Sequence, residues 1–296
     1  MKLTTCCLLM AAVLAAPTHA ALIAYENFDT TAGTNNISGS SGTGNSGFST
    51  NWTTIGDANG GNIINPGYTY SGLDAAGNRA QVFNASANSD SSATYFYRTL
   101  SSPFTVGANS TGTVWASFLI QATAASGSGL GATIGFFSTT VPTASTNSGV
   151  TIGAVGQNTN YRVANRALDT SGTGVVSTTG TNAGTLSLAV FKFTINTNAG
   201  ANETFSLWLS PDLSEFDGAE GSLGTAVLSN QSLSNMGINS ISSIAFGSNY
   251  VSTGTPTLGL DEIRLGTTVA AVIPEPRAAL LGGLGLLMLL RRRRNA

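Results

Sequence analysis

The sequence predicts an all-β protein, an antiparallel β-sandwich flanked by an N-terminal signal peptide and a single C-terminal helix. Gly, Ser, Thr and Asn are abundant, whereas charged residues make up only 9% of the chain. This composition disfavours helices, whose exposed faces rely on Glu, Lys and Arg. Short segments that alternate apolar and polar residues are separated by Gly- and Ser-rich turns, as in antiparallel sheets. The chain has no internal repeat, which favours two packed sheets over a propeller.

The clearest strands are expected at 113–121 and 186–196. In the first, the even-numbered positions 114–120 share one face, while Trp115 and Leu119 lie on the other. Apolar residues on both faces predict burial on both sides. The second strand has the same character, and a short gap joins it to the next strand as a hairpin. Further strands are expected at 21–25, 79–84, 94–100 (ending near Pro103), 132–138, 150–156, 161–164, 203–210, 241–247 and 258–265.

Residues 1–20 have the features of a secretory signal peptide. Lys2 provides a positive start, residues 8–16 are apolar, and Ala20 ends a short stretch suited to cleavage. We therefore expect signal peptidase to release a body that begins at residue 21. Residues 21–270 are expected to form one domain, because no interior linker divides them; within it, 30–51 is a predicted long loop.

Residues 271–296 form a second targeting signal, at the C-terminus. The apolar stretch 278–290 spans only about 20 Å as a helix, short of the roughly 30 Å of a bilayer core. The terminal arginines resist translocation and hold this end on the cytoplasmic side. The segment therefore predicts a transient anchor in the inner membrane. Its motif residues are Pro274, Glu275, Pro276, Arg291, Arg292, Arg293 and Arg294.

This ordered set of a Pro-Glu-Pro motif, an apolar helix and an arginine cluster resembles the PEP-CTERM sorting signal of Gram-negative bacteria. The resemblance implies recognition by an exosortase-type membrane protease and removal of the tail. It also implies delivery of the body to the cell surface or extracellular matrix. An ordinary stop-transfer anchor is the alternative.

Composition excludes several functions for the body. Cys6, Cys7 and His19 are the only cysteines and histidine, and all lie in the leader. The body therefore has no disulfides, thiol catalysis, Ser-His-Asp triad or zinc held by His or Cys. The whole chain carries a formal charge of −2, but the body, with six cations and thirteen acids, carries −7. An acidic surface with few Lys and Arg argues against nucleic-acid binding.

The body itself resembles the concanavalin/laminin-G-like jelly roll, in the version common among PEP-CTERM proteins. The residues that carry the resemblance are 24–29, 114–118, 207–211 and 260–266. The resemblance implies a jelly-roll sandwich, and carbohydrate or matrix binding as its function, although such sandwiches host many functions.

An acidic cluster offers a catalytic alternative. Glu215, Asp217 and Glu220 have a spacing that resembles the catalytic strand of laminarinase-type glycosidases, in which they would be nucleophile, helper and acid/base. Retaining hydrolysis needs two carboxyls about 5–5.5 Å apart, yet on a regular strand Glu220 points away from Glu215. A solvated acidic loop is the favoured interpretation. Together with Asp212, these acids could instead bind Ca²⁺.

A second calcium site is expected where the first and last strands meet. Glu26 and Asp29 follow the first strand, while Asp261 and Glu262 lie in the last. Jelly rolls place these strands side by side, and carboxylates are the ligands that Ca²⁺ prefers. Pairing with Arg264 or another cation is the alternative.

Four aromatic residues are candidates for stacking on a glycan: Trp208, Trp52, Tyr68 and Tyr70. Trp208 alternates against inward-facing residues, and the others lie in loop-like sequence. Ordinary packing is the alternative for each of them.

These observations predict an exported, non-enzymatic β-sandwich protein of the cell surface or extracellular matrix, with a structural or glycan-adhesive role. The expected partners are signal peptidase, an exosortase-type protease, the inner membrane during transit and an extracellular polysaccharide. A glycoside hydrolase that uses Glu215 and Glu220 is one alternative. A soluble carbohydrate-binding module is the other.

Overall fold

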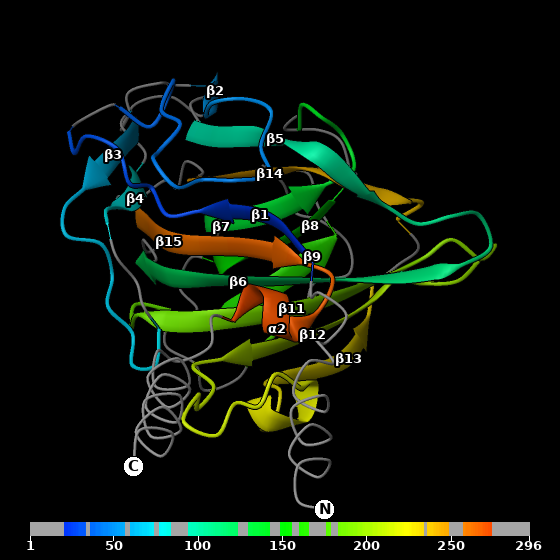
Figure 1. The fold of residues 1–296 in the computed structure, drawn as a ribbon. Helices are drawn as coiled ribbons and strands as arrows, with labels where there is room; N and C mark the ends of the chain where they lie inside the picture. The colour runs from blue at the N-terminus through cyan, green and yellow to red at the C-terminus, as the bar shows by residue number, and fades with distance from the viewer. Residues whose placement is uncertain are drawn as a thin grey trace, which may run out of the picture.

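The computed structural model shows two packed β-sheets (Figure 1). The signal peptide and the sorting motif, including Pro274, Glu275, Pro276 and the terminal arginines, lie outside the described residues. Within the described part of the chain, no helix has the length and apolar character needed to span a bilayer. The structure describes residues 21–33, 36–56, 60–73, 77–83, 94–123, 130–142, 149–155, 160–165, 176–178, 183–233, 236–248 and 257–273.

The first sheet has the strand order β13-β12-β11-β6-β15-β4-β3, with β1 also paired to β15. Its strands are antiparallel throughout, and β11 and β12 form the predicted hairpin. The strands are β1 (Leu22–Glu26), β3 (Gly61–Ile64), β4 (Arg79–Phe83), β6 (Thr111–Thr123), β11 (Ser187–Asn196), β12 (Thr204–Leu209), β13 (Leu228–Ser232) and β15 (Thr257–Gly266).

The second sheet has the order β10-β9-β8-β7-β14-β5-β2 and is also antiparallel. The prediction of an antiparallel β-sandwich is therefore confirmed. The strands are β2 (Thr53–Gly56), β5 (Thr94–Thr105), β7 (Leu130–Phe137), β8 (Gly149–Val155), β9 (Tyr161–Asn165), β10 (Val176–Ser177) and β14 (Ser240–Ser248).

Every expected strand is present, and β5 runs past the expected end of its regular part at Leu100 to Thr105, just beyond Pro103. The pairing of β5 with β14 skips from Thr99 to Phe104 while β14 advances only from Ile241 to Ser243. Pro103 therefore falls in an irregular stretch, where its missing N–H breaks no ladder hydrogen bond. The strand resumes beyond it and ends at Thr105.

The core between the sheets consists of the inward faces that the alternation predicted. Val114 and Phe118 of β6 and Phe191 and Phe193 of β11 are all buried there. Phe136 of the second sheet packs against Phe191, with 6.2 Å between ring centroids. Aromatic contacts across the two sheets thus hold the layers together.

The outer face of the first sheet is also buried, as the apolar second faces of β6 and β11 predicted. A second cluster forms there around Trp115, Leu119 and Trp208. It is covered by the segment after β12 and by the short helix α2 (Val269–Val272) after β15. Ile273 is also buried in this cluster.

Candidate functional site

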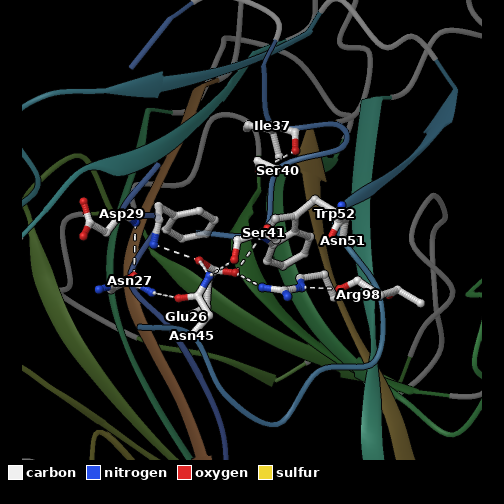
Figure 2. A network of polar contacts seen from close by, with 12 residues as sticks. Glu26, Asn27, Asp29, Ile37, Ser40, Ser41, Asn45, Asn51, Trp52 and Arg98 are labelled. Carbon is white, nitrogen blue, oxygen red and sulfur yellow. Dashed lines mark hydrogen bonds and ion pairs between the residues drawn. The ribbon is translucent and has the colours of Figure 1, made fainter. Parts of the chain in front are cut away.

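A buried polar network surrounds Glu26 at the end of β1 (Figure 2). The Glu26 side chain is 1% exposed. Its Oε1 accepts from the backbone N–H of Phe28 at 2.8 Å and from Nδ2 of Asn45 at 2.6 Å. Its Oε2 accepts from Nε1 of Trp52 at 2.8 Å and forms an ion pair with Arg98. Four donors thus occupy the lone pairs that a carboxylate offers.

Arg98 links this network to the second sheet, because it lies on β5 whereas Glu26 lies on β1. Its Nε donates to the carbonyl of Thr50 at 2.8 Å, and its guanidinium lies 4.2 Å from the ring centroid of Phe48. Burial lowers the pKa of Arg98, and the ion pair with Glu26 opposes that shift. The network is an internal clamp that holds the two sheets and residues 45–52 together.

Trp52 belongs to this clamp and is only 1% exposed. Its ring contacts Phe28 and Phe246, with centroids 5.8 and 4.7 Å away. Trp52 therefore has no free face for a glycan, which corrects the expectation that it could stack on one. The sequence suggested a loop-borne platform because 30–51 is polar and Gly-rich, but that loop folds back and buries the indole.

The carboxylate of Glu262 is held by hydrogen-bond donors from two side chains. The hydroxyl of Tyr25 donates to both of its oxygens, at 3.0 and 2.9 Å, and Nη2 of Arg264 lies 3.0 Å away. Its backbone has a φ of 50°, at the point where β15 loses register with β6. Pairing with Arg264, the alternative that the sequence left open, is therefore observed.

Asp261 faces a different segment, the loop between β3 and β4. Its Oδ2 accepts from the backbone N–H of Tyr68 at 2.8 Å, and its Oδ1 from that of Glu262 at 2.9 Å. A Cβ added at Gly67 would lie 2.6 Å from the same Oδ2, so glycine permits this close approach. Burial raises the pKa of Asp261 to about 8, because it outweighs the backbone hydrogen bonds, which lower the pKa.

The four acids expected to hold calcium are engaged separately. Glu26 binds Arg98, Glu262 binds Tyr25 and Arg264, and Asp261 accepts two backbone N–H groups. Asp29 is exposed and accepts from the hydroxyl of Thr43 at 2.7 Å. Across the described ranges, no three Asp, Glu, His or Cys residues gather as metal ligands would. Calcium binding here remains a prediction that the geometry does not support.

The acidic cluster 215–220 lies in turns and at the start of the 3₁₀ helix η2 (Glu220–Leu223), not on a strand. Glu215 and Asp217 are exposed, and Asp217 accepts from the backbone N–H of Ala219 at 2.9 Å. Glu220 forms an ion pair with Lys192 at 2.6 Å. A catalytic strand was the geometry that the hydrolase alternative required, and the structure does not contain it in this segment.

Trp208 projects from the outer face of the first sheet, as the alternation of β12 predicted, but it is only 5% exposed. Its ring stacks on Trp115 with 5.7 Å between centroids, and its Nε1 donates to the carbonyl of Gly224 at 3.1 Å. The segment after β12 covers it. Trp208 is therefore a packing residue, which corrects its assignment as a glycan contact.

Tyr68 and Tyr70 remain at the surface, each half-buried, in the loop between β3 and β4. The hydroxyl of Tyr68 donates to Oε1 of Gln121 at 3.1 Å, and the guanidinium of Arg79 lies 4.9 Å from its ring centroid. Tyr68 is thus tied to its neighbours. Tyr70 packs against the cluster around Trp208 and donates its hydroxyl to the carbonyl of Pro211 at 3.4 Å, and it also borders a surface cleft.

This cleft has a volume of about 390 Å³ and separates two loops that are far apart in the sequence. One is the turn after Tyr70, and the other follows β12. The residues that line it combine one aromatic ring, three serine hydroxyls and one carboxylate: Tyr70, Ser71, Ser210, Pro211, Asp212 and Ser214, among others. Sequence reasoning identified Tyr70 but missed the serines and the meeting of the two loops.

The structure is a two-sheet antiparallel β-sandwich with a small surface cleft beside Tyr70. No family model and no curated protein matches the sequence. One similar solved structure is the cellulose induced protein Cip1, with 17% identity, 73% of this chain and 91% of that chain covered, and a TM-score of 0.43.

The binding domain of botulinum neurotoxin serotype D/C is another similar structure. It has 11% identity and a TM-score of 0.43 over 83% of this chain and 49% of that chain. The chain thus spans about half the length of that neurotoxin chain. With TM-scores below 0.5, nothing about a ligand follows from either likeness.

Proposed function

We propose that this chain is an exported, non-enzymatic β-sandwich protein that adheres to glycans at the cell surface or in the extracellular matrix. In this proposal signal peptidase removes residues 1–20. The C-terminal segment 271–296 then anchors the body in the inner membrane until an exosortase-type protease releases it. The two signals in the sequence support the route, and the cleft supports the adhesive role.

The position of Tyr70 is the main observation that supports the adhesive role. It is the candidate aromatic side chain that borders a cleft, whereas Trp52 and Trp208 are buried. A tyrosine ring offers an apolar face together with a polar edge, which suits the C–H face and the hydroxyls of a pyranose. Serine hydroxyls and a carboxylate beside it supply the few placed polar groups that fix a small ligand.

Replacing Tyr70 by alanine is expected to weaken glycan binding by at least about tenfold, since aromatic anchors dominate binding sites of this kind. The measurement is a glycan microarray on the protein purified from the producing cells, followed by calorimetric titration of the best ligand. Tyr97→Ala is the matched control, because Tyr97 is also half-buried but lies on β5 of the second sheet. Failure of the unmodified protein to bind any glycan would contradict the proposed function.

A further inference from the structure

The cleft beside Tyr70 is a preformed site rather than a gap between mobile loops. Its far wall is fixed to the sheet, because the backbone N–H of Ser210 donates to the carbonyl of Leu188 at 2.7 Å. Leu213 in the same wall is 4% exposed and packs in the cluster around Trp208. A site that is ordered before binding loses less conformational entropy when a ligand enters.

The near wall is a tight turn. The backbone N–H of Leu73 donates to the carbonyl of Tyr70 at 3.1 Å, and Gly72 has a φ of +83°. A Cβ at Gly72 would lie 3.3 Å from Cβ of Leu213. The two walls thus approach each other closely at this point, and the glycine keeps the cleft open beside it.

The cleft carries a negative charge. Of the described residues that line it, Asp212 alone is charged. Its Oδ1 accepts from the backbone N–H of Ser214 at 2.9 Å, and hydrogen bonds from Ser214 lower its pKa. Asp212 is therefore ionised at neutral pH and remains an acceptor-only group. An ionised carboxylate has about four acceptor positions, so it retains room for hydroxyl donors of a ligand.

These features set the class of ligand. A volume of about 390 Å³ lies at the small end of ligand pockets. An anionic ligand would meet Asp212 without a compensating cation among the described lining residues. A ligand with many hydroxyl donors and an apolar face fits the cleft, because the hydroxyls can donate to Asp212 and the apolar face can pack on Tyr70.

We propose that the cleft between Tyr70 and Asp212 binds an uncharged pyranose residue, whose hydroxyls donate to the Asp212 carboxylate, and discriminates against uronic acids and other anionic sugars. This inference rests on the proposed glycan-adhesive function. It adds the location of the site, Asp212 as the residue that determines specificity, and the preference for uncharged over anionic sugars.

The test compares the affinities of the purified protein for a neutral oligosaccharide and for its uronic-acid counterpart. The unmodified protein is expected to bind the neutral sugar at least about tenfold more tightly, and Asp212→Ala to lose at least about tenfold of that affinity. Asp212→Asn keeps an oxygen for the N–H of Ser214 but removes the charge. It is therefore expected to narrow the difference between the two sugars.

Asp217→Ala is the matched control, because Asp217 is also exposed and accepts from the backbone N–H two residues later, yet lies outside the cleft. Thermal melts of each variant separate lost binding from lost folding, and Asp212→Asn answers the question if Asp212→Ala does not fold. Tighter binding of the acidic sugar would overturn the inference. If Tyr70→Ala and Asp212→Asn both leave neutral-sugar binding unchanged, the inference is also wrong, but the proposed adhesive function stands. No glycan binding at all would overturn both.

Discussion

Replacing Glu26 by alanine is expected to lower the free energy of unfolding by about 3–5 kcal/mol. The substitution removes the acceptor of four hydrogen-bond donors and leaves the Arg98 guanidinium, whose side chain is 5% exposed, without its counter-ion. Breaking a buried ion pair from one side costs far more than the pair contributes as a whole, because an uncompensated charge remains inside the protein. Urea denaturation of the purified protein measures the loss.

Glu220→Ala provides the matched control for Glu26→Ala. It also removes the acid of an ion pair, but Glu220 and Lys192 have side chains that are 42% and 29% exposed. Solvent screens such a pair, so the expected loss is below about 1 kcal/mol. If the two variants were destabilised equally, the assignment of Glu26 as a buried clamp between the sheets would be wrong.

Replacing Asp261 by asparagine is expected to flatten the dependence of stability on pH. In the folded protein burial raises the pKa of Asp261 to about 8, whereas an unfolded aspartate titrates near about 3.9. Between these values the folded state keeps a proton that the unfolded state releases. Stability contributed by this group is therefore present below about pH 4 and is lost as pH rises towards 8, at up to about 1.4 kcal/mol per pH unit.

Urea denaturation at several pH values between 4 and 8 measures this slope. Asp217→Asn is the control, because that aspartate is exposed and hydrogen bonds lower its pKa. Glu203, whose pKa burial also raises, contributes a slope of the same sign, so the Asp261→Asn variant keeps part of the dependence. A slope that Asp261→Asn leaves unchanged would show that this carboxyl is ionised in the folded protein.

The parts of the fold that the sequence predicted are those with strong periodicity. β6 and β11 are 13 and 10 residues long and carry apolar residues on both faces, and the structure buries both of these faces. β2, β3, β10 and β13 were missed because they are short, at two to five residues each: Thr53–Gly56, Gly61–Ile64, Val176–Ser177 and Leu228–Ser232. Such strands form because a neighbouring strand offers free backbone groups, and that information is not local.

The candidate site was predictable only in part, because its contacts join distant segments. Tyr70 stood out as an aromatic residue in a polar loop, but its neighbour Pro211 lies 141 positions away. The same limit affected Glu26, which looked like a metal ligand beside other acids. Its partner, Arg98, lies 72 residues further along the chain, and no sequence motif links the two residues.

The central claim is that the body is exported and released from a temporary C-terminal tether. Intact-mass spectrometry of the protein recovered from the surface or matrix of the producing cells tests it most directly. The expected mass corresponds to a chain that starts at Ala21 and ends beyond Ile273, without Arg291–Arg294. A full-length chain that retains these arginines and stays in the inner membrane would contradict the claim.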